Sequence, residues 1–234
     1  MKTKIFAHRG SKGKYPENTL LSFEKALHEN ADGIELDVHL TKDGEVAVIH
    51  DEKLERTTNG KGYVKDFTLA ELKKLNAGDN QQIPTLAEVF TMLGNTDTEL
   101  NIELKTGHIS YNDIESKVLS VADKYSGGRN VIYSSFHLPT LIRLKKLNSQ
   151  AKIAWLLHMQ SPLPNPADYI ETLGLEALHL EKGMVLSNPA HYRDIYDKLR
   201  VWTVNDENEI KELIKLGVGA IITDFPDIAA GCII

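Results

Sequence analysis

Short apolar runs rich in β-branched residues recur along the chain, and they constrain its fold more than any other feature. Amphipathic segments separate most of them, an alternation typical of parallel strands joined by helices. Eight such units in 234 residues fit a closed α/β barrel, (β/α)8, with an open doubly wound sheet as the alternative. Nine strands are predicted, at residues 5–7, 33–38, 46–49, 100–104, 131–136, 152–157, 177–180, 200–204 and 219–223.

The second and third runs break the alternation, because only residues 41–45 separate them. A crossover between parallel strands needs about a dozen residues. The Lys42-Asp43-Gly44 segment has the composition of a hairpin turn. We therefore expect a hairpin-like connection, which accounts for a ninth strand beside an eight-stranded barrel.

Residues 51–84 are polar and contain glycine, and they form a small insertion within a single predicted domain spanning residues 1–234. A helix is predicted in this insertion only over residues 68–75, where Thr68 and Glu71 make a capping box. Long excursions on compact domains are usually functional. We expect this one to lean over the active face of the barrel.

Helix boundaries are marked elsewhere by capping residues. Thr85 and Glu88 form a second capping box. Asp206 with Glu209 opens another predicted helix, and Gly217 lies where a left-handed C-terminal cap would end it.

Composition narrows the functional classes. The net charge is −6 and no block of Lys or Arg is present, which argues against a nucleic-acid partner. Cys232 is the single cysteine, so no internal disulfide forms. No run approaches the ~18 apolar residues of a membrane helix. The first residues, MKTKIFAHRG, reach a polar HRG before an apolar leader segment could form, so we expect no secretion signal there. We expect a cytoplasmic protein with a small-molecule substrate and no stable membrane association; homo-oligomerisation stays open.

Three carboxylates occupy predicted strands. Glu35 and Asp37 face one side of a strand whose other residues are apolar, and an edge strand with a solvated acidic face is the alternative. Glu103 ends another strand, with Lys105 on the same side, where a structural ion pair is the alternative. Buried like charges need a cation or strong hydrogen-bond donors to stay ionised. Together the three carboxylates predict a site for one divalent cation, Mg²⁺ or Ca²⁺.

Two histidines end predicted strands near these carboxylates. His8 and Arg9 follow the first strand, where catalytic groups of a barrel lie. His50 closes the third run, which the hairpin returns alongside residues 35–37. Hydrolysis of a phosphodiester needs a base for the attacking oxygen, an acid for the leaving alkoxide, and positively charged groups next to the phosphate oxygens. His8, His50, Arg9, Lys105 and a metal would meet these needs.

Two aromatic residues, Phe136 and Trp202, end later strands, and each either walls a substrate pocket or fills the barrel. His39 continues the alternation of Glu35 and Asp37, and its place near the site stays open, as does that of His137. The remaining histidines lack acidic partners at useful spacing, and we expect them to be structural or at the surface: His28, His108, His158, His179 and His191.

The chain resembles the glycerophosphodiester phosphodiesterase family in segments that span nearly its whole length. The combination of HRG with PENT, ELDV-x-LTKDG, and HD with RTTNG is highly specific. The segments are AHRGSKGKYPENTLLSF, ADGIELDVHLTKDGEVAVIHDEKLERTTNGKG, IPTLAEVF, LNIELK, SSF, VWTVND and IITDFPD. Residues from about 151 to 198 carry no matching motif.

This resemblance implies a TIM-type barrel with a small insertion after His50. It implies metal-dependent hydrolysis of glycerophosphodiesters to sn-glycerol 3-phosphate and an alcohol. His8 would act as base and His50 as acid, and Arg9 and Lys105 would contact phosphate. The metal ligands would be Glu35, Asp37 and Glu103, and Trp202 would line the glycerol side of the pocket. Attack by water and attack through a cyclic phosphate both stay open.

Two other functions compete. A related barrel phosphodiesterase acting on lysophospholipids would favour an exposed apolar rim, and the insertion is too polar to suggest one. A non-catalytic phosphate-binding barrel should have lost part of the proposed site. That site is complete, which favours the hydrolase.

Overall fold

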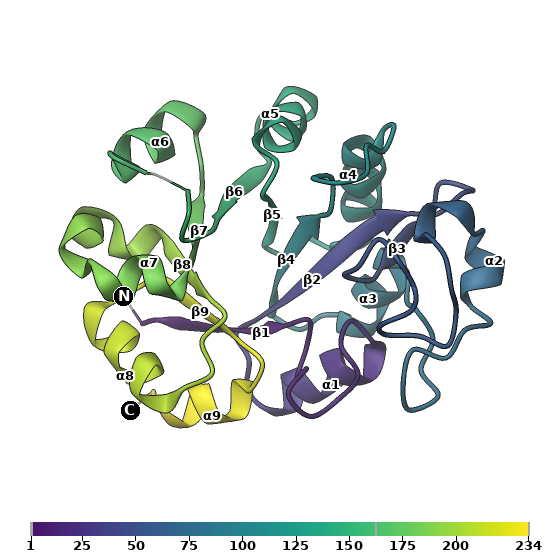
Figure 1. The fold of residues 1–234 in the computed structure, drawn as a ribbon, viewed down its shortest axis with the longest axis horizontal. Helices are drawn as coiled ribbons and strands as arrows, with labels where there is room; N and C mark the ends of the chain where they lie inside the picture. Colours follow the sequence, from purple (N-terminus) through teal and green to yellow (C-terminus); the bar gives the residue numbers. More distant parts are fainter. Residues whose placement is uncertain (1, 162, 234) are drawn as a thin grey trace.

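The computed structural model describes residues 2–161 and 163–233, and its centre is a closed barrel of parallel strands surrounded by helices (Figure 1). β1 pairs with both β2 and β9, which closes the barrel. The expected (β/α)8 barrel is confirmed, and the open doubly wound sheet is excluded. The barrel strands are β1 (Lys4–His8), β2 (Gly33–Leu40), β4 (Glu99–Leu104), β5 (Val131–Ser135), β6 (Lys152–Leu157), β7 (Ala177–Glu181), β8 (Leu199–Trp202) and β9 (Ala220–Thr223).

Helices cover the outside of the barrel, because the outward side chains of the strands and one face of each helix are apolar. Thr85 caps α3 through a capping box, and Asp206 caps α8. Gly217 ends α8 in the left-handed conformation, at φ 80°, as expected. The helices on the barrel are α1 (Leu20–His28), α3 (Leu86–Leu93), α4 (Ile114–Tyr125), α5 (Leu138–Leu147), α6 (Pro166–Leu173), α7 (Lys182–Ser187), the 3-10 helix η2 (Pro189–Lys198), α8 (Glu207–Leu216) and α9 (Pro226–Gly231).

The short strand β3 (Val46–Val48) runs antiparallel to β2, with Val38 opposite Val48, so the expected hairpin is confirmed. The backbone N–H of Ile49 donates to the carbonyl of Asp37 at 3.0 Å. This bond holds the chain next to the inward carboxylates of β2. His50 therefore follows directly beside them.

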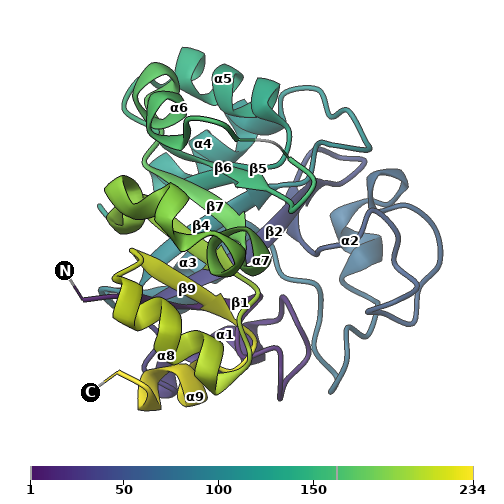
Figure 2. The ribbon, with the colours of Figure 1, turned by 60° about the vertical axis from the view of Figure 1, so that its left-hand side comes forward.

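The segment between β3 and α3 lies beside the barrel, as Figures 1 and 2 both show. It contains a 3-10 helix, η1 (Val64–Asp66), and α2 (Leu69–Leu72). The capping box of Thr68 and Glu71 forms, but the helix predicted over residues 68–75 is too long. Leu75 N–H bonds back only three residues, to Leu72, so the α-helical pattern ends in tighter turns.

β2 shows how the barrel positions its polar side chains. Every residue of this strand is buried, which rules out the edge strand with a solvated acidic face. Ile34 and Leu36 belong to the apolar cluster beneath the helices, whereas Glu35 and Asp37 face the barrel interior. Asp37 is paired with Glu103 in the register between β2 and β4. The fold thus places the carboxylates of two strands side by side.

No helix within the described ranges combines the length and the apolar character that a membrane span requires.

Candidate active site

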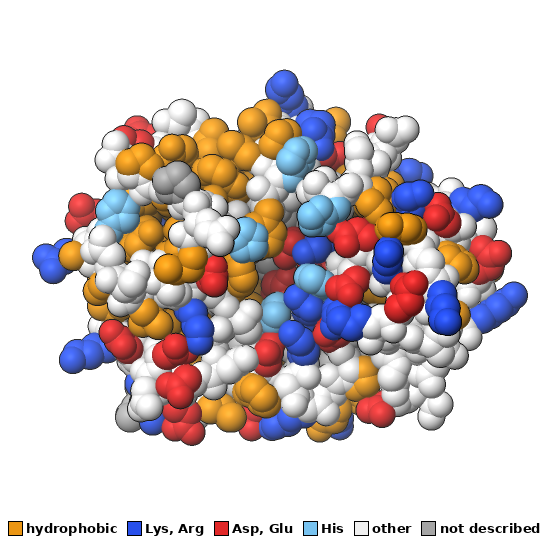
Figure 3. Space-filling model, in the orientation of Figure 1, with side chains coloured by type: hydrophobic (Ala, Val, Ile, Leu, Met, Phe, Trp, Pro, Cys, Tyr) orange, Lys and Arg blue, Asp and Glu red, His pale blue; other side chains and the backbone are white. Residues whose placement is uncertain are grey.

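A hollow of about 520 Å³ opens at the carboxyl ends of the barrel strands. In the space-filling view (Figure 3), histidine side chains lie around the centre of this face. Charged side chains crowd one side of the centre, and hydrophobic side chains gather on the other. Eight of the nine site residues expected from the sequence line the hollow: His8, Arg9, Glu35, His50, Glu103, Lys105, Phe136 and Trp202. The ninth, Asp37, is fully buried beside them.

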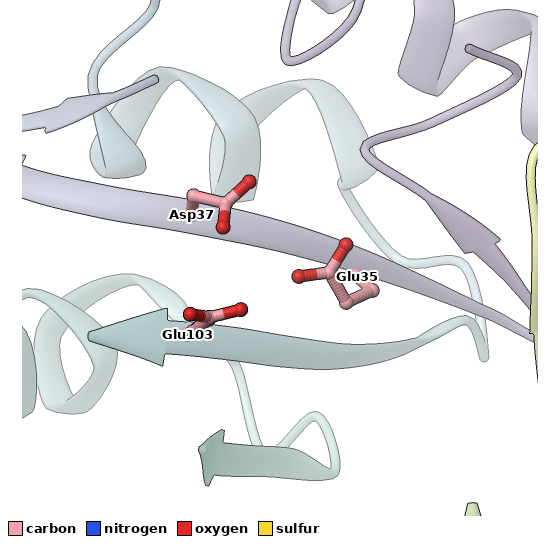
Figure 4. A group of neighbouring side chains, drawn as sticks. All are labelled: Glu35, Asp37 and Glu103. Carbon is pink, nitrogen blue, oxygen red and sulfur yellow. The ribbon is translucent and has the colours of Figure 1, made fainter. Parts of the chain in front are cut away.

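The three carboxylates converge within the barrel (Figure 4). Glu35, Asp37 and Glu103 each offer one oxygen, and these three oxygens lie within 4.8 Å of one another. Oδ1 of Asp37 is buried and has no hydrogen-bond partner. A buried acceptor without a donor is costly, so this oxygen fits a cation. The donor set is made of hard oxygens, as Mg²⁺ and Ca²⁺ prefer.

The electrostatics of the cluster also favour a cation. Burial and then the charges of Asp37 and Glu103 raise the pKa of Glu35 well above its usual range. Burial raises the pKa of Glu103 to about 7, although Lys105 opposes the shift. For Asp37, the positive charges of Arg9 and Lys105 outweigh burial and hold the pKa below its usual range. Glu35 and Glu103 therefore have too little positive charge around them to be ionised as easily as in water. A divalent cation would supply that charge.

Arg9 and Lys105 lie against the same carboxylates. Arg9 Nε is 3.3 Å from Asp37, and Lys105 Nζ is 2.8 Å from Glu103 and 3.7 Å from Asp37. The Glu103–Lys105 ion pair that the sequence allowed is thus present, beside the carboxylate cluster rather than in place of it. Both cations border the hollow, where they could contact an anionic substrate.

His8 is held by a carboxylate from the far end of the chain. Its Nδ1 lies 2.6 Å from Oδ1 of Asp224, and Asn205 donates to the other oxygen of Asp224 at 2.9 Å. A carboxylate can only accept, so the neutral imidazole carries its proton on Nδ1 and exposes the lone pair of Nε2. Burial lowers the pKa of His8 more than Asp224 raises it. The ring is therefore suited to accept a proton near neutral pH.

His50 is held in the same way by its neighbour in the chain. Its Nδ1 lies 2.6 Å from Asp51, and its Nε2 is 3.2 Å from Lys105 Nζ. Burial lowers the pKa of His50, with Asp37 opposing the shift and Lys105 adding to it. Arg56 bonds both oxygens of Asp51, at 2.7 and 2.8 Å, and both oxygens of Glu17, at 2.8 and 2.9 Å. The 51–84 segment is tied to the site by this arginine.

Aromatic rings form the opposite wall of the hollow. Phe136 stacks on His158 with ring centroids 4.3 Å apart, and Trp202 packs edge-on against both rings. Trp202 Nε1 also donates to the carbonyl of His179 at 3.0 Å, which fixes the indole at the wall. One side of the hollow is therefore charged and the other apolar.

Several residues of the site were not predicted from the sequence. Asp51 and Asp224 hold the two imidazoles; Asp51 directly follows His50, whereas Asp224 lies far from His8 in the sequence. Three histidines that were expected to be structural or at the surface line the hollow: His108, His158 and His179. His108 and His158 are exposed and His179 is buried, which agrees with that expectation, but the sequence did not show that all three border the hollow. His39 is buried and bonds the carbonyl of His50 at 3.0 Å, so it supports the site from behind.

A hollow at the carboxyl ends of barrel strands, lined by imidazoles and carboxylates, has the arrangement of a barrel enzyme's active site. The model of the glycerophosphoryl diester phosphodiesterase family matches residues 8–228, and the chain belongs to this family.

Named relatives are similar in sequence to this chain over nearly its full length. The chain is 44% identical to a glycerophosphodiester phosphodiesterase from Bacillus altitudinis, covering 96% of both chains. It is 42% identical to one from Caldanaerobacter subterraneus, covering 97% of this chain and 96% of the other.

Solved structures share the fold. A phosphodiesterase from Oleispira antarctica, solved in complex with the product sn-glycerol-3-phosphate, superposes with a TM-score of 0.88 at 28% identity, covering 99% of this chain and 97% of that one. A glycerophosphodiester phosphodiesterase from Thermotoga maritima gives a TM-score of 0.83 at 30% identity, covering 99% and 98%.

Proposed function

We propose that this protein hydrolyses water-soluble glycerophosphodiesters to sn-glycerol 3-phosphate and an alcohol, in a reaction that depends on one divalent cation. The observation that carries the proposal is the pairing of two imidazoles, each held at Nδ1 by a carboxylate, over a cluster of three buried carboxylates. Family membership supports glycerol as the constant half of the substrate.

His8 and His50 act as the acid–base pair in this proposal. His8 takes a proton from the attacking oxygen through Nε2, because its Nδ1–H is bonded to Asp224. His50 delivers a proton to the leaving alkoxide. His50 is protonated and positively charged until it makes this transfer, and Asp51 stabilises that charge. Each carboxylate also fixes the ring orientation, as proton transfer over a hydrogen bond requires.

Arg9 and Lys105 bind the phosphate group. They border the hollow directly after β1 and β4 and lie against the carboxylates Asp37 and Glu103. Glu35, Asp37 and Glu103 would hold the cation, Mg²⁺ or Ca²⁺. When bound, the cation supplies positive charge that stabilises the phosphate oxygens as negative charge develops. Trp202 and Phe136 would wall the uncharged part of the substrate.

The first test is hydrolysis of several glycerophosphodiesters, with glycerol 3-phosphate measured in a coupled assay. His8→Ala and His50→Ala should each lower kcat by about 10²- to 10⁴-fold, the range that acid–base catalysis contributes. His28→Ala is the matched control, since His28 lies exposed on α1 and should keep wild-type activity. Activity within a few-fold of wild type in either site variant would refute the acid–base assignment.

The same assay separates the proposed substrate class from its competitor. Glycerophosphocholine and glycerophosphoethanolamine should be hydrolysed faster than a lysophosphatidylcholine, whose acyl chain the polar 51–84 segment does not suit. A clear preference for the lysophospholipid would instead assign the protein to the lipid-acting phosphodiesterases.

A further inference from the structure

Two buried polar side chains at the floor of the hollow have no role in the proposed chemistry. His179 lies on β7 and Asn101 on β4, and both line the hollow among the apolar side chains of Leu156 and Ile222. His179 is 0% exposed, and neither of its ring nitrogens has a hydrogen-bond partner. Asn101 is 1% exposed, and its Oδ1 has no partner, although its amide donates to Ser134 at 3.0 Å.

Unpartnered polar atoms of this kind are costly in a folded protein, because burial removes their bonds to water. Burial and the nearby charge of Arg200 lower the pKa of His179 well below its usual value, so the ring is neutral. A neutral imidazole has one donating and one accepting nitrogen. The carboxamide oxygen of Asn101 adds an acceptor. A hydroxyl group, which both donates and accepts, matches this set.

The position of the floor decides which part of a phosphodiester reaches it. The phosphate would lie by Arg9 and Lys105, at the strand ends above the floor. Trp202 lines the same hollow, and its indole N–H donates to the backbone carbonyl of His179. The floor is enclosed, whereas Gly107 and His108 at the rim are exposed. A short substituent of constant size fits the floor, and a variable alcohol fits the rim.

We propose that His179 and Asn101 bind the terminal hydroxyl of the substrate's glycerol and thereby select glycerol over other alcohols at that position; this inference rests on the proposed function. The terminal hydroxyl is the part of the glycerol farthest from the phosphate ester. It is therefore the group that reaches deepest into the barrel.

The test compares glycerophosphocholine with the phosphocholine ester of propane-1,2-diol, which lacks only the terminal hydroxyl. This analogue keeps the middle hydroxyl, so it can react by either mode of attack. Choline release gives kcat/KM for both compounds. Wild-type protein should prefer glycerophosphocholine by roughly 10- to 100-fold, as expected for leaving buried polar groups unpaired. In His179→Leu this preference should fall to within about 3-fold.

Several results would overturn the inference. A purely structural role of His179 would lower both kcat/KM values equally and leave the preference unchanged. Wild-type protein that hydrolyses both compounds equally would also refute it. Asn101→Leu, on the opposite side of the floor, should reduce the preference as well and gives a second variant if His179→Leu does not fold. His28→Leu makes the same chemical change on the exposed face of α1 and should keep the wild-type preference.

A binding measurement keeps this inference separate from the proposed function. Calorimetry with sn-glycerol 3-phosphate and with the phosphate ester of propane-1,2-diol requires no turnover. If neither diester is hydrolysed but the glycerol compound binds more tightly, and His179→Leu removes the difference, the floor assignment holds while the proposed reaction fails. Equal binding of the two compounds to wild-type protein would refute the floor assignment alone.

Discussion

At the scale of single residues, each proposed catalytic imidazole depends on a carboxylate that fixes its tautomer. Asp224→Asn should lower kcat by at least about 10-fold, because the amide can no longer act only as an acceptor from Nδ1 of His8. Asp224 raises the pKa of His8, so its removal should move the acidic limb of the pH–rate profile to lower pH. The measurement is kcat and kcat/KM across pH 5–8 with glycerophosphocholine.

The direction of this change distinguishes a positioning role from a general loss of structure. His8 acts as a base only when it is neutral, and a lower pKa keeps it neutral in more acidic solution. Asp227→Asn is a suitable control, since Asp227 is paired with Lys14 rather than with a histidine. An acidic limb that stays in place while kcat falls would show that Asp224 does not control the titration of His8.

The chemical residues themselves could be predicted because they follow strand ends and alternate along strands, both of which are local patterns. The partner of His8 could not, because Asp224 is 216 residues from His8 in the sequence and only barrel closure brings them together. His179 shows a different limit. It shares a face of β7 with Ala177 and Glu181, but both faces of the strand are buried, so the sequence does not reveal which face is inward.

At the scale of elements, the β2–β3 hairpin and the segment that follows it connect the barrel to the site. Arg56 is the strongest link, because it bonds Asp51, the partner of His50, and Glu17, which Arg9 also contacts at 2.9 Å. Arg56→Gln should release the 51–84 segment and lower kcat/KM by about 10-fold or more through misplacement of His50. Kinetics and limited proteolysis of the segment measure both effects.

Lys61 provides the matched control for Arg56, since it is an exposed cation of the same segment. Lys61→Gln should leave both the kinetics and the rate of cleavage near wild type. Faster proteolysis of Arg56→Gln without any kinetic change would mean that the arginine holds the segment but does not position His50.

The elements also differ in how well their ends could be predicted. Every strand lies within about two residues of its predicted bounds, because β-branched runs and barrel burial favour the same conformation. The start of α2 was also predicted, since Thr68 and Glu71 form a local capping box. Its end was not, because no residue there has a distinct stop signal and the tighter turns after Leu72 depend on packing within the segment.

At the scale of the whole molecule, closure of the barrel concentrates negative charge from β2 and β4 in its interior. A cation that binds the folded chain and not the unfolded one stabilises the fold by mass action. At 100 times its dissociation constant this amounts to about 2.7 kcal/mol. For a chain of this length the midpoint of thermal unfolding should rise by about 5–10 °C when Mg²⁺ or Ca²⁺ is added after EDTA.

Variants separate metal binding from catalysis in this measurement. Glu103→Gln removes one of the three converging charges, so the thermal shift should largely disappear. His8→Ala removes a proposed catalytic group outside the carboxylate cluster, so its shift should match that of wild type even though its activity is lost. If neither cation shifts the midpoint of wild-type protein, the three carboxylates are not a metal site. The raised pKa values of Glu35 and Glu103 would then mean that protons, rather than a cation, neutralise the charge inside the barrel.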